Sequence, residues 1–290
     1  MGRSKDLAKN TAILTFGKIC TQSISFFMLP LYTSLLSTAE YGLFDLLVTY
    51  AALLLPLVNW QLDQGLFRFM LDVRGQIDKQ TYLFSTVFLT SMIQSVVFCI
   101  LFFIIYPFLT LEHADFLLYY VILHIYTAMF LQFARGLGKT SKYAVASFIS
   151  ALATVILNVL ALAILKLGLR GLFIATISAQ VLTIFYLIMV TKCWRFFSIK
   201  AVKLELFNEV RKYSIPLIPN NLAWWIVNSS DRMVISHFIG ISANGIFTVA
   251  SKFSNVFISF YNVVNLSWTE SVSLHFDDED RDCFLSEMMT

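Results

Sequence analysis

The stretch YLFSTVFLTSMIQSVVFCILFFIIY, residues 82–106, contains no charged residue. An α-helix needs about 20 mostly apolar residues to cross the hydrocarbon core of a bilayer, so this segment is long enough to span it. Hydrophobic residues make up 58% of the chain and charged residues only 13%. Soluble domains carry about 25% charged residues and have no interior large enough for so much apolar surface. The sequence therefore predicts an all-α polytopic membrane protein.

Apolar runs of similar length recur on both sides of this segment and predict eight membrane-spanning helices. Their expected ranges are 11–36, 42–62, 82–106, 115–134, 144–165, 171–191, 215–238 and 245–268. The first run follows the basic flank MGRSKDLAKN without a small-residue cleavage site, so we expect an uncleaved helix rather than a signal peptide. Pro56 is expected to bend the second helix, whereas Pro216 and Pro219 should open the seventh.

The basic residues of the connecting segments alternate between two sides. The N-terminal segment and the segments 63–81, 135–142 and 192–213 together hold fifteen Lys and Arg residues. The segments on the other side hold only Lys166 and Arg170. Because cytoplasmic loops are enriched in basic residues, the first side is predicted to be cytoplasmic. With eight helices, the N-terminus and the acidic C-terminal segment both lie on that side.

A shift of 203 residues places SLLSTAEYGLFDLL, from Ser34, over HFIGISANGIFTVA, from His237. Both stretches cover the outer end of one predicted helix, a short turn and the start of the next helix. Parallel repeats of this kind occur in transporters. We therefore expect a six-helix N-terminal lobe at 1–191, a basic linker at 192–213, and the start of a second lobe at 214–290. The second lobe would hold only two helices, which suggests a truncated repeat.

Polar residues recur at steps of three or four residues in several predicted helices, so each set lines one helix face. The second helix carries Asp45, Thr49, Asn59 and Asp63, for example. We infer a polar cavity between the two lobes, formed by the first, second, seventh and eighth helices. The candidate cavity residues are Lys18, Gln22, Asn221, Trp224, Asn228, Asp231, Arg232, Lys252 and Asn255.

Two interpretations of these stripes remain open. A Lys, Arg or Asp at the centre of a membrane helix costs about 2.5–3.5 kcal/mol on insertion scales, which favours a functional role for Lys18, Asp231, Arg232 and Lys252. Ser, Thr and Asn side chains, in contrast, often hold neighbouring helices together through hydrogen bonds. Trp224 is equally compatible with sugar stacking and with ordinary helix packing.

Chemistry of other kinds finds no support in the sequence. The stretch GLGKTSK, residues 136–142, lacks the full spacing of a phosphate-binding loop, and no zinc-protease or serine-hydrolase motif occurs. The four cysteines are too far apart for a metal site. The predicted outer loops are too short for a catalytic domain, and a net charge of +3 is no signal for nucleic acid. We therefore predict a protein that is not an enzyme and has no cofactor.

The stretch RKYSIPLIPNNLAWWIVNSSDRMVISHFIGISANGIFTVASKF, residues 211–253, resembles the seventh and eighth helices of Wzx-type O-antigen flippases. These proteins form the polysaccharide-transport family, in the superfamily that also contains MATE exporters and lipid II flippases. The stretch KNTAILTFGKICTQSISFFMLPLYTSLLSTAEYGLFDLL, from Lys9, is similar to the family's first two helices. The family has about twelve to fourteen helices, so the resemblance covers this whole chain but ends early in the second lobe.

The resemblance implies transport of an oligosaccharide linked to undecaprenyl pyrophosphate across the bacterial inner membrane, for O-antigen and lipopolysaccharide synthesis. Its carry-over to single residues is limited to Asn220, Asn221, Asp231, Arg232 and Lys252, and a cationic cavity would use Lys18, Arg232 and Lys252. The implied partners are the lipid-linked oligosaccharide, membrane lipid, and the polymerase and chain-length proteins of the pathway. Coupling to H⁺ or Na⁺ is left open, with Asp231 as the first residue to test.

Two other functions are compatible with the same pattern. A MATE-like exporter of cationic drugs would have a cavity dominated by acidic groups, whereas here basic groups at least equal them. A non-transporting scaffold for polysaccharide assembly would be favoured if the chain naturally had only eight helices. A membrane enzyme would need the large outer loop that is missing from the predicted topology.

Overall fold

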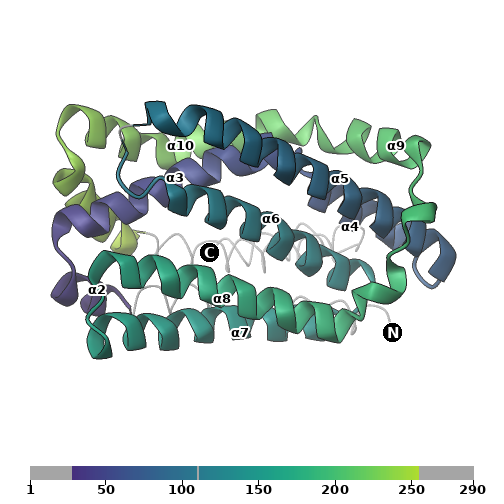
Figure 1. Ribbon diagram of the computed structural model, residues 1–290, viewed down its shortest axis with the longest axis horizontal. Helices are drawn as coiled ribbons and strands as arrows, with labels where there is room; N and C mark the ends of the chain where they lie inside the picture. Colours follow the sequence, from purple (N-terminus) through teal and green to yellow (C-terminus); the bar gives the residue numbers. More distant parts are fainter. Residues whose placement is uncertain (1–27, 110, 255–290) are drawn as a thin grey trace, which may run out of the picture.

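The computed structural model describes residues 28–109 and 111–254, and every regular element in these ranges is a helix (Figure 1). Within these ranges, five segments are long and apolar enough to cross a membrane. They are Thr38–Asn59 (α3), Ile77–Phe108 (α5 and a 3-10 turn), Asp115–Gly136 (α6), Thr140–Ile164 (α7 and a π-helical end) and Gly168–Thr191 (α8). The predicted class, an all-α polytopic membrane protein, is confirmed.

Shorter or more polar helices complete the described chain. They are α2 (Leu29–Leu35), α4 (Leu62–Asp72), α9 (Leu204–Ser214), α10 (Leu217–Phe238) and a last helix at 241–254. Two 3-10 turns, Cys193–Phe196 and Ile199–Ala201, lie between α8 and α9. The predicted first helix up to residue 27 and the predicted eighth helix beyond residue 254 lie outside the described residues.

Helix α3 begins four residues before its predicted start and ends three residues before its predicted end. Ser37 and Glu40 form a capping box, in which each side chain bonds the backbone N–H of the other residue. At the other end, Trp60 and Gln61 adopt left-handed backbone angles, with φ of 52° and 56°. The chain then continues as α4, so part of the predicted loop at 63–81 is an additional helix.

The prolines take two different positions. Pro56 lies inside α3, and the helix continues past it to Asn59, so the sharp break comes at Trp60 and Gln61 instead. Pro216 precedes α10 and Pro219 lies in its first turn, where a missing N–H costs little. The prediction that these two prolines open the seventh helix is confirmed.

Helix α6 lies in the middle of the bundle, with α3 and α5 on one side and α7 and α8 on the other (Figure 1). Aromatic side chains fill two clusters around it. Phe133 packs on Phe84 with ring centroids 4.3 Å apart, and Phe116 packs on Phe173 at 4.4 Å. Because lipid is as apolar as these side chains, close packing rather than burial from water is the gain that holds such helices together.

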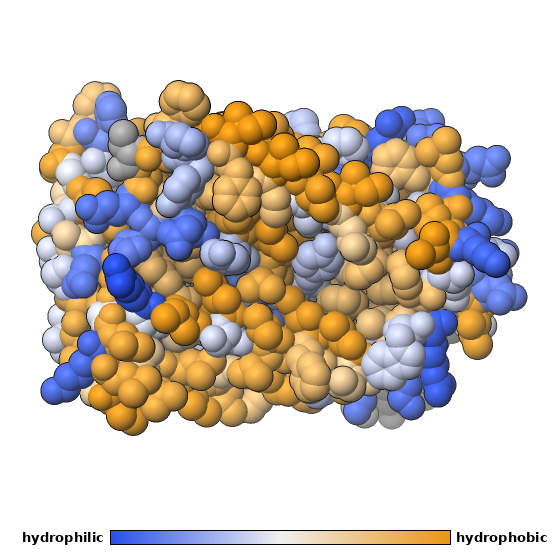
Figure 2. All heavy atoms as spheres, viewed as in Figure 1, coloured by the Kyte–Doolittle hydropathy of each residue, from blue (hydrophilic) through white to orange (hydrophobic). Residues whose placement is uncertain are grey.

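Helix α5 has the least buried span and turns large apolar side chains outward, among them Ile93, Val97 and Phe103. Figure 2 shows an apolar belt across the middle of the face in view, with hydrophilic residues gathered toward its two ends. Such a belt matches the hydrocarbon core of a bilayer. The protein is therefore a multi-pass membrane protein.

The two ends of the bundle differ in charge. The connections at 73–76, 137–139 and 192–203 lie at one end, together with α4 and α9, and this end carries twelve of the fifteen basic residues. Lys166 and Arg170 lie at the opposite end. Burial, and then the charges of Lys192 and Lys142, lower the pKa of Lys139 at the first end. We name the first end the basic end and the second the opposite end.

Candidate functional site at the junction of three helices

Charged side chains from α3 and α10 meet close to the opposite end of the bundle. The Arg232 Nε atom lies 2.9 Å from Asp45 Oδ2, and both side chains are only 15% exposed. At 1.5 Å rise per residue, Asp45 lies about 10 Å from the start of α3, and Arg232 about 9 Å from the end of α10. The N–H of Nε is not aligned as a hydrogen bond, so charge attraction carries this contact. An ion pair thus ties α10 to α3 within the apolar belt.

The helix at 241–254 adds two residues to this pair. Thr248 Oγ1 donates a hydrogen bond of 2.8 Å to Asp45 Oδ2, the same oxygen that faces Arg232. Lys252, one turn further on and half-buried, interacts electrostatically with both Asp45 and Arg232. One cation is therefore paired with the carboxylate, and a second cation lies nearby. Asp231 is more exposed, and its carboxylate lies 4.0 Å from the Arg232 guanidinium, at the edge of the group.

Two glycines allow α3 and the last helix to approach closely. A methyl group on Gly42 would overlap the Ile241 carbonyl oxygen, and one on Gly245 would overlap the Thr38 carbonyl oxygen. Asn244 Nδ2 also donates a hydrogen bond of 2.9 Å to the Gly42 carbonyl oxygen. Any side chain at either glycine would push the two backbones apart. We call this set, Gly42, Asp45, Arg232, Asn244, Gly245, Thr248 and Lys252, the junction.

The contacts of the junction follow the 203-residue repeat. Gly42 corresponds to Gly245, Asp45 to Thr248, and Thr38 to Ile241. Gly42 approaches Ile241 while Gly245 approaches Thr38, and Asp45 bonds its own counterpart. Reciprocal contacts of this kind define an interface around a local twofold axis. The helices that the sequence repeat relates thus pack on each other symmetrically, whereas the division into two complete lobes remains a prediction.

The structure separates the candidate cavity residues on α10 into two faces. Arg232 points toward α3, as does Trp225, whose Nε1 donates a hydrogen bond of 3.0 Å to the Thr49 carbonyl oxygen. Four candidates lie on the exposed face, namely Asn221, Trp224, Asn228 and Asp231. The two asparagine amides there bond the backbone one turn earlier, at Leu217 and Trp224. Only Arg232 and Lys252, of the candidates described, share one site.

Lys18, Gln22 and Asn255 lie outside the described residues. The polar cavity to which they were assigned therefore stays a prediction.

Asp45, Thr248 and the two glycines are absent from the candidate set. Asp45 does belong to the polar stripe of the second predicted helix, and it is the only charged residue between Phe44 and Asn59. The repeat also aligned Gly42 with Gly245. Combining the two signals would have identified the junction, because residues near a twofold axis contact their own counterparts.

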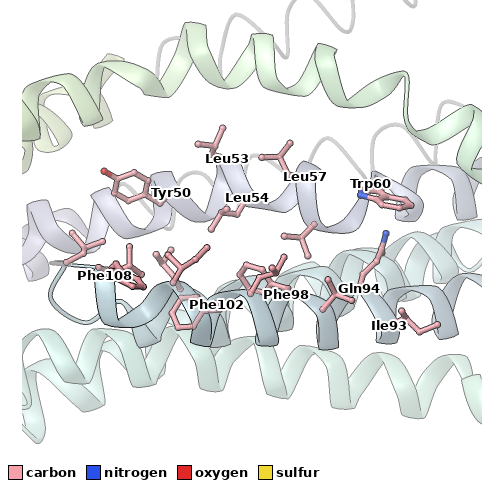
Figure 3. Close-up of a pocket in the computed structure, with 17 residues that line it drawn as sticks. Tyr50, Leu53, Leu54, Leu57, Trp60, Ile93, Gln94, Phe98, Phe102 and Phe108 are labelled. Atoms are coloured by element: carbon pink, nitrogen blue, oxygen red, sulfur yellow. The ribbon is translucent and has the colours of Figure 1, made fainter.

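A groove of different character lies between α3 and α5, with a volume of about 970 Å³. Its lining is almost wholly apolar, and Figure 3 shows Trp60 and Gln94 near one end and Phe108 at the other. Neither amide atom of Gln94 has a partner among the described residues, although both are buried. This surface suits hydrocarbon rather than sugars, so it is distinct from the predicted polar cavity.

Within residues 28–109 and 111–254 no three His, Cys, Asp or Glu side chains gather as metal ligands. The junction contains cations, a carboxylate, a hydroxyl and an amide, which are groups for holding charge and for reversible ion pairing. The fold and this site define a multi-pass helical membrane protein whose charged groups lie between helices related by an internal repeat.

Comparison with protein families assigns this class more closely. A family model described as polysaccharide biosynthesis protein matches residues 7–268. The chain belongs to this family, which contains the Wzx-type polysaccharide flippases. Comparisons with curated proteins and with solved structures gave no significant match. The resemblance found in the two sequence stretches is thereby confirmed, and the family together with the helical membrane fold points to a transporter-type protein.

Proposed function

We propose that this protein is a flippase that moves oligosaccharide units linked to undecaprenyl pyrophosphate across the bacterial inner membrane. The observation that carries the proposal is the junction, where the Arg232–Asp45 ion pair and the nearby Lys252 lie inside the apolar belt of a polysaccharide-biosynthesis family member. A pyrophosphate needs charged donors, and Arg and Lys supply them best where water is scarce.

The transport route follows from the charge pattern. The basic end would face the cytoplasm, where the lipid-linked unit is made, with both chain termini on that side. The junction closes the helices near the opposite end, so this conformation would admit the substrate from the cytoplasmic side. The membrane potential then assists outward movement of an anion by about 2.3 kcal/mol per charge per 100 mV.

The chemistry of the substrate fits the surfaces of the protein. Asn221, Asn228 and Trp224 present amides and an aromatic face on the exposed side of α10, and sugars pair with both kinds of group. The proposed partners remain the lipid-linked unit, membrane lipid, and the polymerase and chain-length proteins of O-antigen and lipopolysaccharide synthesis. The part played by H⁺ or Na⁺ is a separate question, and Asp231 and Asp45 are the carboxylates to test.

A MATE-like drug exporter is the second candidate. It would present acidic groups to cationic drugs, whereas in the junction Asp45 is already neutralised by Arg232 and outnumbered once Lys252 is included. With Asp231 at the edge of the group, basic and acidic residues are equal in number, so the site is not dominated by the acidic groups that a cationic drug would need. A scaffold without transport activity would have no need for charges between repeat-related helices.

Complementation tests the proposal. The full-length protein should restore surface polysaccharide in a flippase-deficient strain. Arg232→Ala and Lys252→Ala should each lower that rescue roughly tenfold, because each removes a charged donor that the pyrophosphate would bind. Surface polysaccharide is measured on gels, with protein level measured in the same membranes.

Lys212→Ala is the matched control, since Lys212 is an exposed lysine at the basic end. It should rescue as well as the unmodified protein. Full rescue by the Arg232→Ala, Lys252→Ala double variant would contradict a role for the junction in binding the pyrophosphate.

A further inference from the structure

We propose that Asp45 is an internal counter-ion that the pyrophosphate of the substrate displaces from Arg232, so that substrate binding itself loosens the junction. This inference rests on the proposed function and adds a trigger to it. It assigns a positioning role to a residue that would not touch the substrate.

A single oxygen atom of Asp45 contacts both of the other helices in the junction. Asp45 Oδ2 lies 2.9 Å from Arg232 Nε on α10 and accepts the 2.8 Å hydrogen bond of Thr248 on the last helix. Since α3 bears Asp45, this atom holds both other helices to α3. Loss of the Arg232 pairing therefore weakens the closure at its centre.

Depth in the membrane sets the order of events. Lys252 lies about 16 Å from the start of the last helix, whereas Asp45 lies about 10 Å from the start of α3. An anion that comes from the basic end therefore meets Lys252 before it reaches Arg232. A phosphate offers the guanidinium two oxygens in the geometry that Arg binds best, so it competes directly with the single Asp45 oxygen.

Polar contacts lie at the centre of the packing between α10 and α3. No residue of α10 is fully buried among the described residues, and the Asp45 ion pair and the Trp225 hydrogen bond both join this helix to α3. Between α3 and the last helix, the glycines bring the backbones close enough for Thr248 to reach Asp45 and for Asn244 to reach the Gly42 carbonyl oxygen. Polar contacts therefore contribute to the closure beside the apolar packing, and polar contacts are what an anion can exchange.

A thiol reporter measures this exchange without any transport. Thr248 is fully buried in the closed junction, and a cysteine keeps a weak donor at that position. Thr248→Cys is made in a protein whose Cys20, Cys99, Cys193 and Cys283 are serine, and the purified full-length protein is placed in nanodiscs. The rate of labelling by a water-soluble maleimide is then followed with inorganic pyrophosphate or with sodium chloride of equal ionic strength.

Pyrophosphate should raise the labelling rate roughly fivefold or more, which is the lower end of usual coupling between two sites. Asp45→Asn should label fast without pyrophosphate and show no further response. Asp45→Glu, which keeps the charge, should respond like the unmodified reporter, and it guards against a folding defect in the Asn variant. Glu112→Gln is the matched control, because Glu112 is an exposed carboxylate at the opposite end.

Slow labelling of the Asp45→Asn reporter without pyrophosphate would overturn the inference. An increase in its labelling rate with pyrophosphate as large as that of the unmodified reporter would overturn it too. Its failure is distinguishable from failure of the proposed function. If the protein rescues surface polysaccharide but pyrophosphate does not change the labelling rate, the counter-ion role of Asp45 is refuted and the flippase function is not. If pyrophosphate raises the labelling rate but the protein does not rescue surface polysaccharide, the flippase function is refuted and the counter-ion role of Asp45 is not.

Discussion

Asp63 lies directly after the break between α3 and α4 and is 7% exposed. Its carboxylate accepts hydrogen bonds of 2.8 Å from Asn59 Nδ2 and 3.0 Å from Gln64 Nε2, so it joins the two helices across the left-handed residues Trp60 and Gln61. Burial raises the pKa of Asp63, and the hydrogen bonds from its own backbone N–H and from Gln64 oppose that effect only in part. Its role at the break is therefore structural.

The raised pKa predicts a pH dependence of stability. A carboxyl whose pKa is higher in the folded protein stabilises the fold fully below its unfolded value of about 3.9 and loses that contribution as pH rises through the folded value. The melting temperature of the unmodified protein should therefore fall more than that of Asp63→Asn as pH rises from about 4 to 8. Melting in detergent at the two pH values measures this difference. A fall of equal size in both proteins would show that Asp63 is not the group responsible.

At the residue scale, the sequence predicted the basic residues of the junction, Arg232 and Lys252, better than the acidic residue Asp45. Arg232 and Lys252 stood out because they interrupt apolar helices near the end of the chain. Asp45 was seen only as part of a stripe, since nothing local to it says which helix it faces. That information is tertiary, and only the packing of α3 against α10 supplies it.

At the scale of the elements, the junction depends on how closely α3 and the last helix approach. Gly42→Ala and Gly245→Ala each place a methyl group on a backbone carbonyl oxygen, so the helices must separate. Overpacking usually costs about 1–3 kcal/mol, and here the strain falls on the closure itself. We expect both variants to reach normal levels in the membrane but to lose most of the rescue of surface polysaccharide.

Ala52→Val is the control for these variants, because Ala52 is an exposed residue on the same helix. Complementation and immunoblotting measure the outcome together. Normal rescue by Gly42→Ala would show that close approach at the junction has no part in transport.

The element boundaries show where sequence reasoning reached its limit. The periodicity of the apolar runs placed α5, α6 and α8 within a few residues of their observed ends. The start of α3 had a signal in Ser37 and Glu40 that a search for capping boxes would find. Its end had none, because Trp60 and Gln61 are unusual residues for a left-handed backbone. The charges of α4 made this amphipathic helix look like a loop.

At the scale of the whole molecule, lipid as solvent explains most of what could be predicted. Composition fixed the fold class, because so apolar a chain needs a bilayer around it. The alternation of basic loops agrees with a bundle whose connections gather their charge at one end. The two-lobe arrangement depends on residues outside the described ranges and so remains a prediction.

The most direct measurement of the central claim uses purified full-length protein in vesicles with a lipid-linked oligosaccharide that carries a radiolabelled sugar. The fraction of sugar open to an external glycosidase is followed with time. The labelled sugar should cross the membrane when the protein is present and should cross roughly tenfold more slowly with Arg232→Ala, because that variant lacks a charged donor for the pyrophosphate. Equal crossing with and without the protein would contradict translocation, and equal crossing by the Arg232→Ala variant would contradict passage through the junction.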